Sequence, residues 1–288
     1  MPAPSSSVGP TVSTADGRPI YKRTKAVAIP AGQAGAVAWQ FVDSNGDPLD
    51  LSSLSAGSVK FKVFDAVSLG AISPVAWSGT FVSAAAGTVS LPLDPSLVAL
   101  PSVQTVDAVV MDGGGVVRVT NRFSLFVDRS AWASTIDENG PPALSDVRLH
   151  LRDSGPEDNW WLDNEEFDLA EICQAAEKCV RFWNETLPPI DQNFTTATWP
   201  WRARMLTGMT GYLYQMAARH YRRVHLPYSA AGLTVDDKNK AQEYQAIGDA
   251  MWQEFAGFVT AQKVSMNASA AIGTLGSAYG LSQGLYSW

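Results

Sequence analysis

A run of carboxylates precedes a stretch of helical periodicity, and such groups could serve acid–base or metal chemistry. It comprises Glu157, Asp158, Asp163, Glu165, Glu166, Asp168 and Glu171. Catalysis would also need a histidine, a metal ligand set or a nucleophile within reach, and the pattern offers none. Carboxylates favour the positive end of a helix dipole, so we expect this run to start a helix. The alternative is an acidic contact face for a partner.

A basic run lies on a helix predicted from about Pro200 to Val224. Its members are Arg202, Arg204, Arg219, Arg222 and Arg223, with His220 and His225. Three interpretations stay open: salt bridges to the acidic start of the previous helix, a ring of arginines facing DNA, or a solvated face. Because His220 falls on the apolar side of the predicted helix, we expect it to be packed in the core.

Motifs of enzymes and metal sites are missing from the sequence. There is no Ser–His–Asp elbow, GxGxxG, Walker loop or HExxH. The two cysteines, Cys173 and Cys179, point about 240° apart on a helix, and we expect both to be buried thiols. The acidic turn that contains Asp43, Asn45 and Asp47 lacks the glutamate that ends a calcium loop. We therefore expect neither enzymatic activity nor a cofactor or metal.

Charge is sparse in this chain. Charged residues make up 17% and hydrophobic residues 46%, so more of the surface is free to contact other proteins. The net charge of −7 argues against a general DNA-binding role, although a local basic patch is compatible with it. We expect no secretory signal at the N-terminus and no membrane span, because no run of 18 apolar residues occurs.

An alternation of period two predicts short strands between Tyr21 and Arg129. The strand-like segments are 25–29, 36–42, 58–64, 88–91, 106–111, 116–120 and 123–127. In one of them Val59, Phe61 and Val63 alternate with more polar residues, which is typical of a half-buried strand. Strands at this spacing, without helices between them, predict an immunoglobulin-like β-sandwich.

Helical periodicity governs the chain from Leu144 to about Lys263. The predicted helices cover 144–151, 169 to the Leu187-Pro188-Pro189 stop, 200–224 and 234–263. Gly208 and Gly211 in the third indicate a close helix–helix approach or a bend. The buried face of the fourth is predicted to hold Tyr244, Ile247, Met251, Phe255 and Phe258. Together these helices predict a small antiparallel bundle.

No charged side chain occurs from Val264 to Trp288. Because glycines separate single apolar residues, we expect an extended tail that docks in a groove or adds a strand on a partner, with a disordered tail as the alternative. The predicted docking residues, which include a tryptophan pair in the loop after Leu151, are Ile272, Leu275, Tyr279, Leu281, Leu285, Tyr286, Trp288, Trp160 and Trp161.

The sequence thus predicts an α+β multidomain protein. The expected parts are an extended arm (1–19), an immunoglobulin-like sandwich (20–130), a linker (131–143), an α-helical domain (144–263) and a docking tail (264–288).

The short helix, the loop and the long helix that ends in WNE-x-x-PPI, residues 183–190, resemble the helical head–tail connector (adaptor) proteins of tailed bacteriophages. The strand–turn–strand phrase 42–49 followed by 59–64 is similar to the N-terminal sandwich of phage upper-baseplate proteins. The resemblance implies a ring of twelve copies below the portal protein, in the virion neck, assembled in the cytoplasm of the host bacterium.

The expected function is therefore a virion structural protein that joins the portal to the tail-terminator protein or the next neck ring. Passing genomic DNA would be contacted without sequence specificity. The candidates for facing the DNA channel, or for contacts between subunits, are Arg219, Arg222, Arg223, Arg202 and Arg204. One alternative is a baseplate or fibre-attachment protein. Another is a glycan-binding module that uses tryptophan pairs such as Trp160/Trp161 and Trp199/Trp201 as platforms.

Overall fold

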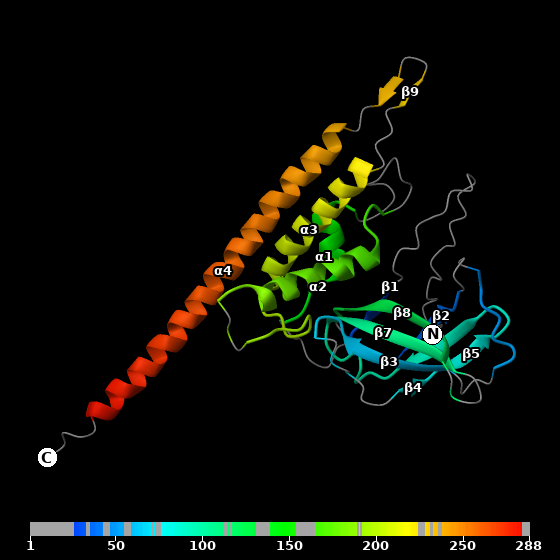
Figure 1. Cartoon of the computed structure of the whole chain (residues 1–288), viewed down its shortest axis with the longest axis horizontal. Coiled ribbons are helices and arrows are strands. Elements are labelled where there is room, and N and C mark those ends of the chain that lie inside the picture. Colours follow the sequence, from blue (N-terminus) through cyan, green and yellow to red (C-terminus); the bar gives the residue numbers. More distant parts are fainter. Residues whose placement is uncertain are drawn as a thin grey trace.

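The structure is a computed structural model in which strands occupy the first half of the chain and helices the second (Figure 1). It describes residues 26–32, 35–42, 47–54, 59–68, 70, 72, 76–111, 115, 117–130, 139–153, 165–188, 190, 192–223, 228–230, 233–235 and 238–283. The predicted mixture of helices and sheets is confirmed. The arm 1–19 and the turn at Asp43 and Asn45 lie outside the described residues.

The strands of the first half form two sheets. Their bounds are β1 (Ala26–Pro30), β2 (Gly35–Gln40), β3 (Val59–Asp65), β4 (Trp77–Ser78), β5 (Thr80–Ser83), β6 (Thr88–Leu93), β7 (Ser102–Met111) and β8 (Val117–Asp128). A five-stranded sheet has the order β1-β8-β7-β3-β4, and a three-stranded sheet has the order β2-β6-β5. The pair β1–β8 is parallel, and the other pairs in these two sheets are antiparallel.

One hydrophobic core lies between the two sheets. Val59, Phe61 and Val63 are buried in it, which confirms the predicted alternation in β3. Trp39 of β2 stacks on Phe123 of β8, with 4.0 Å between the ring centroids, and so joins one sheet to the other. This contact adds to the burial of apolar area that stabilises the pair of sheets.

The strands β4 and β5 were not predicted. β4 has two residues, and β5 exposes three of its four side chains, so neither shows the alternation of buried and exposed residues that reveals a strand. They exist because their backbone groups pair with β3 and β6. Backbone pairing of this kind does not require an alternation of apolar and polar residues, so the sequence pattern does not reveal it.

The second half contains α1 (Leu144–Leu151), α2 (Leu169–Glu185), α3 (Arg202–Arg223) and α4 (Lys238–Gln283), with a small hairpin of β9 (Tyr228–Ala230) and β10 (Leu233–Val235) between α3 and α4. The first three helices have the predicted positions. Asp168 is the N-cap residue of α2, and the Glu171 carboxylate accepts its backbone N–H at 3.0 Å, as expected for an acidic helix start.

Glycines let α2, α3 and α4 approach closely. A Cβ at Gly211 would lie 2.8 Å from the backbone nitrogen of Trp252, and a Cβ at Gly248 would lie 2.9 Å from the carbonyl oxygen of Gly211. A Cβ at Gly208 would lie 2.7 Å from the Cys179 sulfur of α2. The close approach predicted from Gly208 and Gly211 is confirmed.

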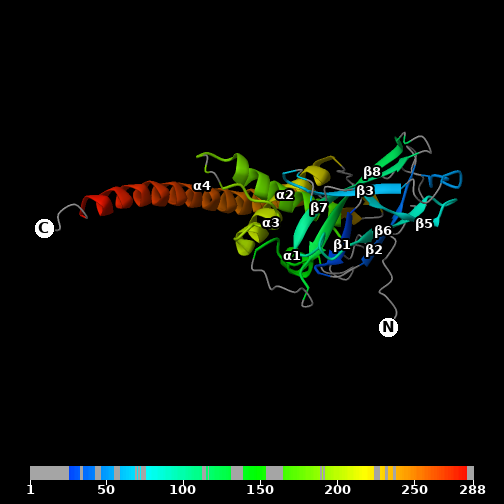
Figure 2. The same ribbon diagram turned by 90° about the horizontal axis from the view of Figure 1, so that it is seen from below.

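The prediction of an extended tail after Lys263 is wrong for residues 264–283, which continue α4. Each residue added to an existing helix gains a backbone hydrogen bond, and Ala268, Ala270 and Ala271 are the best helix formers. Each glycine costs only about 1 kcal/mol, and no proline interrupts the sequence after Pro227. The added part is about 30 Å long at about 1.5 Å per residue. Figures 1 and 2 show it projecting beyond the other helices, on the side away from the sheets.

Two predicted core residues lie at the surface instead. His220 is exposed in the last turn of α3, and Ile247 of α4 is 43% exposed. The buried residues Ala241, Gly248 and Phe255 share one face of α4, and this face is rotated away from Ile247. The buried face of α4 is therefore narrower than the sequence pattern predicts.

The helices pack on the outer side of the five-stranded sheet. Val103 of β7 and Phe126 of β8 belong to the helical core rather than to the core between the sheets. Thr196 donates to the carbonyl of Val103 at 3.0 Å and accepts its N–H at 2.9 Å, and Arg181 donates to the carbonyl of Ala66 at 2.8 Å. The two halves of the chain therefore share a packed interface.

The described part of the predicted linker, residues 139–143, is tied to both halves. The N–H of Gly140 donates to Trp199 at 2.8 Å, and Arg129 donates to the carbonyls of Asn139 and Pro141. The N–H of Leu144 donates to the Asp128 carboxylate at 3.0 Å. These contacts fix the start of α1 against the end of β8.

We predict that Gly248→Ala destabilises the fold by about 1–3 kcal/mol, because the added methyl group meets the α3 backbone. Gly257→Ala in the same helix is the matched control, since its Cβ would meet nothing within 4 Å. It should stabilise the fold by up to about 1 kcal/mol through helix propensity. Urea denaturation measures both, and equal midpoints for the two variants would show that α3 and α4 do not pack this closely.

We also predict a pH dependence from Glu177, which lies at the joint between the two halves. Burial raises the pKa of Glu177 to about 7, an increase that Asp65 supports and Arg181 opposes. The folded state then binds more protons than the unfolded state between about pH 4.5 and 7, so stability falls as pH rises through this range. Glu177→Gln should remove that fall and raise stability at pH 8 by about 1–3 kcal/mol relative to the wild type.

Urea denaturation at pH 5 and pH 8 measures this difference. Glu243→Gln, at an exposed position of α4, is the control and should keep the wild-type pH dependence. A Glu177→Gln variant that still loses the wild-type amount of stability between pH 5 and pH 8 would assign the effect to another group.

Candidate interaction surfaces

The described residues of the acidic run before α2 make contacts that stabilise the fold. Arg148 of α1 is buried, and its guanidinium contacts Asp153 at 2.7 Å and Glu165 at 2.5 Å. The same guanidinium donates to the carbonyl of Phe167 at 2.6 Å. The sequence did not reveal this pair, because Arg148 and Asp153 lie outside the runs of like charge. Glu157, Asp158 and Asp163 lie outside the described residues.

Asp153 holds the backbone just before α2. Its carboxylate accepts the backbone N–H groups of Glu166 at 2.6 Å and of Phe167 at 3.0 Å. A buried carboxylate held by an arginine and two backbone donors has its hydrogen-bonding capacity well used. The predicted docking residues Trp160 and Trp161 lie outside the described residues.

Glu166 links the acidic run to the ends of α3 and α4. Its carboxylate accepts the hydroxyl of Tyr221 at 2.6 Å and that of Tyr244 at 3.1 Å. Lys240 donates to the Tyr221 oxygen at 2.8 Å and lies 3.8 Å from Glu166. Burial, followed by the charge of Glu166, raises the pKa of Tyr244, so the tyrosine is a stable donor. This network fixes the start of α4 beside the end of α3.

The five predicted basic residues lie in three different places. Arg219, Arg222 and Arg223 are exposed together in the last two turns of α3. Arg204 contacts Glu254 of α4 at 2.7 Å and lies 5.3 Å from the ring centroid of Phe258, so it pairs with α4 and not with the acidic run. Arg202 lies at the start of α3, near α1. Only the first three form a candidate basic surface.

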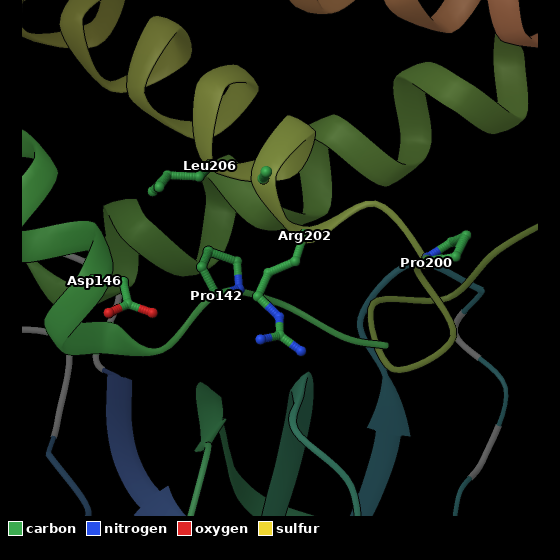
Figure 3. A pocket seen from close by; sticks show the side chains of 6 residues that line it. Pro142, Asp146, Pro200, Arg202 and Leu206 are labelled. Carbon is green, nitrogen blue, oxygen red and sulfur yellow. The ribbon is translucent and has the colours of Figure 1, made fainter. Parts of the chain in front are cut away.

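Arg202 borders an open hollow between α1, the start of α3 and the segment before α1 (Figure 3). The hollow has a volume of about 470 Å³ and is lined by Pro142, Asp146, Pro200, Arg202, Ala203 and Leu206. One acid, one arginine and two prolines do not make a nucleophile–base pair. In the part of the chain that the structure describes, no group of three or more His, Cys, Asp or Glu could hold a metal.

Tryptophans of the second half form an aromatic core. Trp183 of α2 lies 5.7 Å from Trp199 and 4.8 Å from Trp201, measured between ring centroids, and Phe194 and Phe255 complete the group. Trp199 is fully buried and Trp201 is half-buried against this core. The expectation that Trp199 and Trp201 form an exposed pair for sugar stacking is therefore wrong.

Lys263 joins this aromatic core to the root of the projecting part of α4. It is 1% exposed, its ammonium donates to the carbonyl of Thr186 after α2, and it lies 5.5 Å from the Trp183 ring centroid. Burial lowers the pKa of Lys263. A lysine beside the last carbonyls of a helix also complements the negative end of its dipole. Sequence patterns gave no sign of it, because lysines are rarely buried.

The predicted docking residues of the last segment belong to α4 where they are described. At about 100° per residue, Ile272, Leu275 and Tyr279 share one face of the helix and Leu281 falls on the opposite side. Leu285, Tyr286 and Trp288 lie outside the described residues. These predicted docking residues therefore lie on a helix rather than on an extended chain.

Both cysteines are buried and free, as predicted. Burial raises the pKa of the Cys173 and Cys179 thiols, so neither is a reactive thiolate.

No protein-family model matches this chain, and no curated protein matches it. Among the described residues, none of the helices combines the length and the apolar character needed to cross a membrane.

We predict that Asp153→Ala destabilises the fold by about 3–5 kcal/mol, because the buried Arg148 would lose its buried partner and keep only the part-exposed Glu165, and two backbone N–H groups would lose their acceptor. Asp107→Ala is the control: it breaks the pair with Arg122, whose side chain is 66% exposed, and should cost less than about 1 kcal/mol. Thermal and urea unfolding measure both losses. Equal losses would mean that the Arg148 pair adds no more than a surface pair does.

Proposed function

We propose that this chain is a structural protein of a tailed-phage virion, a head–tail connector whose C-terminal helix docks on the neighbouring ring. The observation that carries the proposal is the projecting part of α4. It is about 30 Å long, projects from the body in Figure 1 and contains no charged residue. A helix of this kind gains little by facing water, and covering its apolar stripe with a partner lowers the free energy.

The first half supports the same proposal through its topology. In the proposed immunoglobulin-like arrangement, β1 runs parallel to β8 at one edge, and β2, β6 and β5 form the opposite sheet. Helices cover the outer face of the larger sheet near β7 and β8. The smaller sheet lies on the side away from the helices and is the part available for fibres or other tail proteins.

The two ends of α4 have different chemistry, which suits a part that joins two neighbours. Arg219, Arg222 and Arg223 are exposed beside the start of α4, at the end of the body opposite to the projecting helix (Figure 1). In a closed ring each copy repeats this patch, so a few arginines per chain give a continuous basic band. Such a band binds the DNA backbone without reading its sequence. We propose that it faces the passing genome, with twelve copies in the ring as in the connector proteins that the sequence resembles.

A baseplate or fibre-attachment protein is the second candidate. It rests on the same sheets, which would then be the docking module, with the helices pointing outward. The two candidates place the protein at opposite ends of the tail.

The test is gold-labelled antibody against residues 26–130 on intact particles, viewed by electron microscopy. Label at the head–tail junction is the expected result, label at the distal end of the tail supports the baseplate candidate, and unlabelled particles contradict the virion proposal. Particles assembled with Ile272→Glu/Leu275→Glu should lose the label, because the substitutions place two charges on the apolar stripe. Ser269→Glu/Ser277→Glu adds the same charges outside the stripe and should keep it.

A further inference from the structure

The edge strands of the two sheets differ in how well they are protected against pairing with another chain. Proteins protect such edges by short strands, bulges, prolines or charges. In the described part of the first half, β4 has two residues, β5 has a register shift after Phe81, and β1 ends in Pro30. β2 has six residues in regular register with β6, without a proline or a charge. Of these four edges, β2 is the least protected.

The backbone groups along the free edge of β2 belong to Ala36, Ala38 and Gln40. In an antiparallel pair, every second residue exchanges hydrogen bonds with the neighbouring strand. The N–H of Phe41, directly after β2, donates to the carbonyl of Gly87 at 2.9 Å, directly before β6. Counting back from Phe41 in steps of two gives the residues that bond to β6. The residues between them point their N–H and C=O groups away from β6, where the structure places no described strand.

The free edge of β2 is uncharged and has an apolar border. No charged residue occurs from Ala26 to Val42, a range that covers both β1 and β2. Residues 31–34 connect the two strands, so the edge of the larger sheet lies on the same side of the molecule. Val27 and Ile29 of β1 pack on the core between the sheets there and are only half-buried. A strand added to β2 would cover them with every second side chain.

We infer that β2 binds an extended segment of a neighbouring tail protein, which adds a further strand to the smaller sheet. Backbone hydrogen bonds to Ala36, Ala38 and Gln40 would hold the segment. It is uncharged, because a charge beside β2 would lose water and gain no partner, and it is apolar at every second position, to cover Val27 and Ile29. The inference rests on the proposed function, and it names the chemistry of the partner that the smaller sheet would hold.

A second copy of β2 is the competing occupant. Pairing of two β2 strands would use the same edge of both copies, so it would end with a dimer. A ring of more than two copies is built from contacts between two different surfaces. The proposed connector ring therefore leaves the β2 edge to a different protein.

The first test uses the full chain and a labelled, capped peptide of alternating threonine and valine, about seven residues long, which is the length of β2. Fluorescence anisotropy should show binding to the wild type and about tenfold weaker binding to Ala38→Pro. This proline removes an N–H at the free edge and leaves the bonds to β6 in place. Val82→Pro is the matched control at the opposite edge of the same sheet and should bind as the wild type does.

Thermal unfolding shows whether each variant is folded. Ala38→Lys, which places a charge at the same edge, replaces Ala38→Pro if the proline variant does not fold. A wild type that does not bind the peptide, or a folded edge variant that binds it as tightly as the wild type does, overturns the inference.

The second test identifies the neighbour in assembled particles, with a photoreactive amino acid in place of Ala38. A cross-link to an uncharged segment of another tail protein is the expected result. A cross-link to a second copy of this chain or within the same chain, or no cross-link, contradicts the inference. Gold label at the head–tail junction without the expected cross-link would reject the β2 edge and leave the connector proposal standing, whereas unlabelled particles reject the proposed function itself.

Discussion

The contact of two glycine backbones, Gly211 of α3 and Gly248 of α4, decides how the second half is built. With no Cβ on either residue, the carbonyl of one helix reaches the backbone of the other, at a distance that a side chain would prevent. That contact sets the rotation of α4 about its own axis. Once it is set, Phe255 and Val259 are buried, Ile247 and Val264 are exposed, and the direction in which α4 leaves the body follows.

A second contact fixes the point at which α4 leaves. Lys263 ends the buried face by donating to the carbonyl of Thr186, next to the Trp183 ring. Trp183 belongs to the aromatic group with Trp199, and the same continuous core reaches Val103 and Phe126 on the sheets. The orientation of the projecting helix is thus tied, through packed side chains, to the sheets at the other side of the molecule. Close-packed cores transmit position in this way because they have few alternative arrangements.

Much of this architecture could be predicted from the sequence, and the failures have physical causes. Strands such as β3 were found because alternating burial leaves alternating residue types, and α2 was found because Asp168 and Pro188 mark its limits. β4 and β5 were not, because only backbone pairing defines them. The helix beyond Lys263 was mistaken for an extended tail because single glycines were given too much weight against a helix already formed.

Among the candidate sites, clusters of like charge were easier to predict from the sequence than pairs of opposite charge. Arg219, Arg222 and Arg223 stand out as a run and are indeed exposed together. The pair Lys240–Glu166 does not, because its members come from separate segments that only the fold brings together. The pair Arg148–Asp153 does not, because one arginine and one aspartate five residues apart form no run of like charge. These pairs concentrate charge at the start of α4, whereas its other end has none. α4 therefore has a charged start, held by ion pairs and hydrogen bonds, and an uncharged end that projects from the body. The two ends present different surfaces at a fixed separation, as the proposed connector between two unlike neighbours requires.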